Sequence, residues 1–135
     1  MTLEELNEYG IIKAHIEHCR DKVRELSSRT IRSPIFDTSG ISSSPSSSNP
    51  TEEKYINTMM AKSRCEKQIA EDMEKIERIE KYISSIRDSR TRMIFEMHVY
   101  DNEPFWKIVM KFGGRNTEDS VKRMFYRYLK HHPRG

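Results

Sequence analysis

Residues 105–130 read FWKIVMKFGGRNTEDSVKRMFYRYLK, and this stretch decides the fold expected for the C-terminal part of the chain. Apolar residues recur at helical spacing on both sides of a short GGRN segment at 113–116. Two adjacent glycines provide the positive φ angles with which helices commonly end, and Asn116 or Thr117 is a suitable N-cap for a following helix. The stretch therefore predicts two short helices joined by a tight turn, the outline of a helix-turn-helix.

The second of these helices, at about 117–130, has two chemically different faces. One face is apolar and is expected to pack on the preceding helices. Its members are Val121, Met124, Phe125 and Tyr128. The other face is polar and basic, and arginine suits DNA because its planar guanidinium bonds guanine edges and phosphates in bidentate fashion. We expect this helix to enter the major groove of double-stranded DNA; the alternative is a solvated cationic face on a core helix.

The candidate DNA contacts are the polar and cationic side chains of the turn and of the basic face: Arg115, Asn116, Thr117, Ser120, Lys122, Arg123, Tyr126, Arg127 and Lys130. Arg123 and Arg127 are predicted to contact the groove and phosphates. Arg115, Lys122 and Lys130 are predicted to contact phosphates. The other four residues are secondary candidates.

Positive charge is concentrated in the same region. Residues 104–135 contain eight Lys or Arg and two Asp or Glu, a net charge of +6. The whole chain has a net charge of +3, so residues 1–103 have −3. A basic module on a mildly acidic carrier is typical of nucleic-acid binding.

The N-terminal part of the chain predicts long helices. Residues 1–26 have a capping-box pattern in Thr2 and Glu5, and from Ile12 onward their apolar residues follow heptad spacing. Gly10 is expected to mark a bend or a late start of this helix. Ten of the 24 residues at 27–50 are serine, which predicts a flexible Ser/Pro linker.

Residues 51–85 predict one long helix with Thr51 as its N-cap and a narrow apolar stripe. The stripe comprises Tyr55, Ile56, Met59, Met60, Cys65, Ile69, Met73, Ile76, Ile79 and Ile83, and continues to Ile86. A helix of this kind needs a partner, and the obvious one is the 1–26 helix, folded back antiparallel. Self-association of two such hairpins is the second option, and both arrangements can hold together.

Residues 86–135 predict a separate three-helix module. Its first helix is expected at 88–100 and its second at 104–112, before the basic helix. The inward residues expected on these two helices are Met93, Ile94, Met97, Tyr100, Trp106, Ile108, Val109 and Phe112. The expected fold is thus all-α: an N-terminal antiparallel helical hairpin or coiled coil, a Ser-rich linker and a helix-turn-helix.

Residues 76–130 resemble the region of bacterial sigma factors that recognises the −35 promoter element, and most closely its relatives in phage regulators of the RinA/ArpU type. The matching segments are FWKIV at 105–109, GG at 113–114, SVKR at 120–123 and RYL at 127–129. The resemblance implies a transcription regulator of phage or prophage origin, acting on promoter DNA in the cytoplasm of a bacterial host. RNA polymerase is a further partner that it implies.

Two other functions are compatible with the same sequence. A phage small terminase subunit also joins a helix-turn-helix to an oligomerising coiled coil, and a non-catalytic module could instead dock on RNA polymerase. The sequence shows no catalytic constellation, so we expect neither an enzyme nor a cofactor. His15 and Cys19 have metal-ligand spacing, but a structural zinc needs four ligands, so no metal is expected. No apolar run approaches the ~20 residues that span a bilayer, and the acidic start MTLEELNE is unlike a signal peptide.

Overall fold

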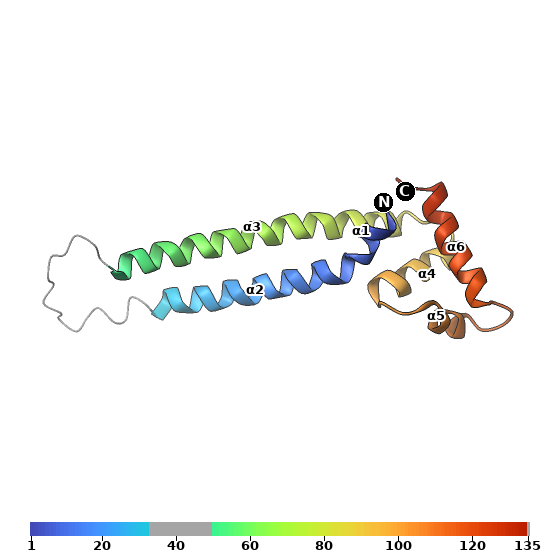
Figure 1. Cartoon of the computed structure of the whole chain (residues 1–135), viewed down its shortest axis with the longest axis horizontal. Helices are drawn as coiled ribbons and strands as arrows, with labels where there is room; N and C mark the ends of the chain where they lie inside the picture. The colour runs from blue at the N-terminus through green and yellow to red at the C-terminus, as the bar shows by residue number, and fades with distance from the viewer. Residues whose placement is uncertain (33–49, 135) are drawn as a thin grey trace, which may run out of the picture. The chain divides into compact units, whose positions relative to one another are not determined.

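The computed structural model describes residues 1–32 and 50–134, and every regular element in these ranges is helical (Figure 1). The elements are α1 (Leu3–Asn7), α2 (Tyr9–Arg32), α3 (Pro50–Ser84), α4 (Ser89–Phe95), the π-helix η2 (Glu96–Tyr100), α5 (Phe105–Phe112) and α6 (Glu118–His131). The expected all-α class is confirmed. The expected linker at 27–50 included residues that are helical, since 27–32 belong to α2 and Pro50 belongs to α3. Its remaining residues, 33–49, lie outside the described ones.

The chain divides into two compact units. Unit 1 comprises Met1–Ala14 and Glu74–Gly135, and unit 2 comprises His15–Met73. Helices α2 and α3 each contribute residues to both units. The three helices of the C-terminal module therefore share a unit with α1, the start of α2 and the end of α3.

The N-terminal capping box forms as the sequence predicts. Thr2 Oγ1 accepts a hydrogen bond from the Glu5 backbone N–H at 3.2 Å, and Glu5 Oε2 accepts one from the Thr2 N–H at 2.8 Å. The helix is interrupted at Glu8, two residues before the glycine that was expected to mark a bend. Gly10 was expected to mark a bend or a late start; the long helix α2 starts at Tyr9, one residue before Gly10, and the break itself lies at Glu8.

In unit 1, the start of α2 is held by a buried tyrosine. The ring of Tyr9 lies 5.0 Å from that of Tyr100, and its hydroxyl donates to Glu80 Oε1 at 3.0 Å. Burial raises the pKa of Tyr9 far above its ordinary value, with the Glu80 hydrogen bond as the second cause. These contacts link α2 to the end of α3 and to η2.

The expected helix at 88–100 is divided into α4 and η2. Asp88 is the N-cap, and its Oδ2 accepts from the Thr91 N–H at 3.0 Å and from the Thr91 hydroxyl at 2.6 Å. The π-helix ends with the Asp101 N–H donating to the Glu96 carbonyl, a bond spanning five residues. The buried residues of α4 and η2 lie on several sides of these helices, whereas Met93 is exposed. They are Thr91, Ile94, Phe95, Met97 and Val99. The single inward stripe expected here was therefore wrong in part.

In unit 2, α2 and α3 run antiparallel around a polar centre. Asp72 is buried, and its Oδ2 lies 2.5 Å from His15 Nδ1. Gln68 Nε2 donates to Asp72 Oδ1 at 3.2 Å, so both carboxylate oxygens have partners. A buried carboxylate needs such partners because losing its hydration is costly.

The apolar stripe expected on the 51–85 helix does not lie on one face. Cys65 and Ile69 are half-buried, and Ile76, Ile79 and Ile83 are buried. The exposed members are Tyr55, Ile56, Met59, Met60 and Met73. The expectation failed because the heptad-like spacing of the second half does not continue toward the N-terminus of α3.

Candidate nucleic-acid interface

The turn between α5 and α6 depends on two glycines. Gly113 has φ 63° and Gly114 has φ 68°, which L side chains rarely adopt. The Gly113 N–H donates to the Val109 carbonyl at 3.0 Å and so closes α5. Asn116 Nδ2 donates to the Gly113 carbonyl at 3.0 Å across the turn. The side chain of Asn116, expected to be a secondary DNA contact, is therefore engaged within the turn.

Helix α6 begins with a second capping box. Thr117 Oγ1 accepts from the Ser120 N–H at 3.1 Å, and Ser120 Oγ accepts from the Thr117 N–H at 3.1 Å. The Ser120 hydroxyl in turn donates to the Thr117 carbonyl at 2.8 Å. Both secondary candidates thus have a structural role, which is to start α6 directly after the glycine turn.

Replacing Thr117 with alanine tests this capping. We expect the free energy of unfolding to fall by about 1 kcal/mol, the usual cost of losing a threonine N-cap. Urea unfolding followed by circular dichroism measures the change. Ser63→Ala is the matched control, since Ser63 is an exposed hydroxyl residue inside α3. An equal effect of both substitutions would contradict a stabilising capping box.

The apolar face of α6 is anchored by Phe125, which is fully buried. Its ring centroid lies 4.4 Å from that of Phe95, 5.5 Å from that of Phe105 and 5.0 Å from that of His98. These rings come from α4, α5 and η2, so one side chain contacts all three neighbouring elements. The contacts fix which face of α6 is left for solvent.

The C-terminal half of α6 is held by Tyr128. Its ring packs edge-on against Tyr82 at 6.1 Å and stacks on His132 at 4.5 Å. The Tyr82 hydroxyl donates to the His132 carbonyl at 2.7 Å, while burial, and secondarily Tyr128, raises the pKa of Tyr82 to about 12. His132 therefore stacks on Tyr128 at the end of α6 while the residue remains exposed.

The exposed face of α6 and its turn presents unpaired cations. Arg115, Arg123, Arg127 and Lys130 are all exposed. Within residues 1–32 and 50–134, none of these four has a hydrogen bond or ion pair. Lys122 differs, since its Nζ lies 3.3 Å from Glu118 Oε1. The four unpaired cations are free to bind an anionic partner without first breaking a bond.

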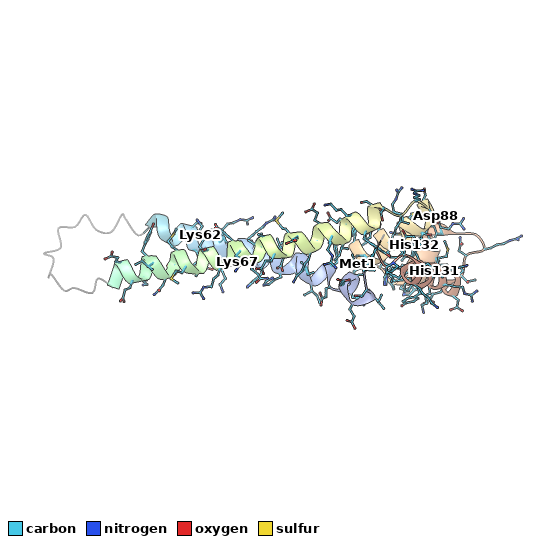
Figure 2. The ribbon with its side chains drawn as sticks, turned by 90° about the horizontal axis from the view of Figure 1, so that it is seen from above. Met1, Lys62, Lys67, Asp88, His131 and His132 are labelled. Carbon is cyan, nitrogen blue, oxygen red and sulfur yellow. The ribbon has the colours of Figure 1, made fainter. Side chains whose placement is uncertain are left out.

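A surface depression adjoins the end of this face. Its lining residues are Thr91, Met124, Arg127, Tyr128, His131 and His132. Figure 2 shows His131 and His132 in the same part of unit 1 as Asp88, the N-cap of α4. Arg127 and the two C-terminal histidines therefore line the same depression, and the histidines are not among the DNA contacts predicted from the sequence.

The acids of α6 lie at its N-terminus. Glu118 and Asp119 occupy the first turn, where their negative charges interact favourably with the positive end of the helix dipole. Their negative charge opposes a phosphate at the same position. Phosphate binding is thus better served by Arg115 and by the cations farther along α6 than by the free N–H groups of the first turn.

Cys19 and His15 of unit 2 are in contact. Cys19 Sγ lies 3.7 Å from His15 Nε2, and Cys19 and Cys65 are both free thiols. Burial raises the pKa of the Cys19 thiol, with Cys65 and Asp72 adding to the effect. Among the described residues, no group of three or more His, Cys, Asp or Glu is arranged to hold a metal ion.

Comparisons with protein-family models, with curated proteins and with solved structures give no match to this chain. None of the helices in the described part of the chain is both long and apolar enough to cross a bilayer. The class that the structure defines is an all-helical protein in which one face of α6 is exposed and cationic.

Proposed function

We propose that the protein is a sequence-specific DNA-binding regulator of transcription, of phage or prophage origin, in which α6 enters the major groove. The observation that supports this proposal most strongly is the division of α6 into an anchored face and a cationic face. Phe125 fixes one side of the helix, while Arg123 and Arg127 project from the other with no partner in the described part of the chain. The resemblance to RinA/ArpU-type regulators points to promoter DNA.

The spacing of the cations suits a groove. Arg123, Arg127 and Lys130 follow each other at i, i+4 and i+7, so they lie along one side of α6 over about 10 Å. The two arginines are assigned to base edges and phosphates, and Lys130 to a phosphate. Arg115 and Lys122 are assigned to flanking phosphates, and Tyr126, which is half exposed, to a secondary contact.

Homo-oligomerisation through the helical N-terminal part belongs to the same proposal. One helix-turn-helix contacts few bases, and two copies on adjacent half-sites increase specificity. We place the protein in the cytoplasm of the bacterial host, where promoter DNA is found.

A second candidate function is docking on a protein such as RNA polymerase, with DNA contact incidental. The observation that favours it is an exposed apolar pair on α5. Trp106 is 51% exposed and Met110 is 73% exposed, four residues farther along the same helix. Exposed large apolar groups at i and i+4 are typical of a helix that contacts another protein.

The salt dependence of DNA binding separates the two functions. A preferred duplex is first selected from random-sequence DNA with the purified chain, and its affinity is then measured by fluorescence anisotropy over a series of salt concentrations. If all five cations contact phosphates, the logarithm of the association constant is expected to fall with the logarithm of the salt concentration with a slope of about −4.5 per copy. An affinity for this duplex that does not change with salt would contradict the proposed function and favour docking through Trp106 and Met110.

A further inference from the structure

An apolar patch is exposed on the N-terminal half of α3, in unit 2. Tyr55, Ile56, Met59 and Met60 are between 40% and 54% exposed. In the same stretch of α3, Thr58 and Ala61 are the half-buried residues. Four neighbouring large apolar side chains at i, i+1, i+4 and i+5 form a continuous surface on one side of a helix. Nothing in the described part of the chain covers this apolar patch.

Charged side chains flank the apolar patch in a directional order. Glu52 and Glu53 precede it, and Arg64 and Lys67 follow it. All four are exposed, and none has an ion pair within the described ranges. At the helical period, Glu53 and Lys67 each lie two turns from Met60 on the same side of α3. The surface is therefore acidic at one end, apolar in the middle and basic at the other end.

Such a surface is complementary to itself in one orientation. When two copies meet antiparallel about a two-fold axis at Met60, each Glu53 lies opposite a Lys67, because both are seven residues, or about 10 Å, from the axis. Ile56 of each copy then lies opposite Arg64, whose aliphatic stem can cover it. A parallel arrangement instead places like charges together, which disfavours it.

We propose that the apolar patch and its flanking charges are a self-association surface, through which the α3 helices of two copies pack antiparallel with Met60 at the two-fold axis. The partner is a second copy of this chain, because the acidic end of the surface in one copy then faces the basic end of the same surface in the other. This inference rests on the homo-oligomerisation proposed above and names the surface for it. It does not depend on DNA binding, because that involves α6, and the test below measures association alone.

The test is sedimentation equilibrium of the full chain over a concentration series. The unaltered protein is expected to form dimers, and Met59→Glu with Met60→Glu is expected to weaken dimerisation at least a hundredfold. Ile11→Glu is the control, since Ile11 is an exposed apolar residue on α2 and lies outside the apolar patch. Circular dichroism shows whether each variant remains helical. A monomer at all concentrations, or an equal effect of the control, would overturn the proposal.

Charge reversal tests the antiparallel orientation. Glu53→Lys alone and Lys67→Glu alone are each expected to weaken the dimer at least threefold, because each places like charges across the interface. Combining both substitutions is expected to restore the affinity of the unaltered chain. Failure of the double variant to recover would contradict the antiparallel pairing. Both residues are exposed, but Glu53 lies in the first turn of α3, where an acid interacts favourably with the helix dipole, so circular dichroism is used to check that each variant keeps its helical content.

Discussion

Replacing Arg123 with glutamate is expected to abolish DNA retention in a gel-shift assay while leaving the helical content unchanged. The substitution removes a bidentate contact, worth about 1–3 kcal/mol, and adds a negative charge that the phosphates repel. Together these effects predict a loss of affinity of about a hundredfold or more, since each 1.4 kcal/mol is about tenfold. The fold should tolerate the change because Arg123 is exposed and has no partner in the described part of the chain.

Lys22→Glu is the control for this experiment. It makes the same change in total charge at an exposed position that belongs to α2 and not to α6 or its turn. Equal losses for the two variants would mean that only total charge matters and that α6 is not the contacting helix. Normal retention by Arg123→Glu would also contradict the assignment of α6. Melting curves of both variants confirm that any loss is not due to unfolding.

Much of the fold could be predicted from local signals. Thr2, Asp88 and Thr117 precede helices because their side-chain oxygens accept from the first free N–H groups. Gly113 and Gly114 were expected to have positive φ, and both do. Signals of this kind depend on residues three or four positions apart, so a single sequence is enough to detect them.

Burial was less predictable because it depends on neighbours that are distant in sequence. Phe95 and Val99 are buried because α4 and η2 are packed on several sides, whereas one apolar stripe was expected. Met59 and Met60 have the opposite outcome: they were expected to be inward and are exposed. Hydrophobic spacing shows that a helix has apolar faces, but not which of those faces another helix covers.

In the candidate site, too, some features could be predicted from the sequence and others could not. The exposure of Arg123, Arg127 and Lys130 follows from helical periodicity and agrees with the sequence. The internal hydrogen bond of Asn116 could not be predicted, because it depends on the path of the turn. The stacking of His132 on Tyr128 depends on where α6 ends, so it also could not be predicted. DNA as the partner remains a proposal in which these exposed cations are the main support.

Replacing Phe125 with alanine is expected to have the largest effect on stability. Its ring is fully buried against Phe95, Phe105 and His98, so the substitution removes contacts with three elements and leaves a cavity. Truncations of this kind cost about 3–5 kcal/mol, a large part of the stability of a small protein. Urea unfolding followed by circular dichroism measures the loss. Phe125→Leu should cost less, because leucine fills part of the space.

Tyr126→Ala is the matched control, because Tyr126 is the next residue on α6 and is 46% exposed. Its loss of unfolding free energy should be clearly smaller, since its ring packs only at the edge of the cluster. The two variants should also differ in DNA binding: Tyr126→Ala removes a secondary contact from a folded helix, whereas Phe125→Ala frees α6 from its support. If both variants had the same stability, Phe125 would not be the anchor of α6, and the cationic face would have no fixed direction.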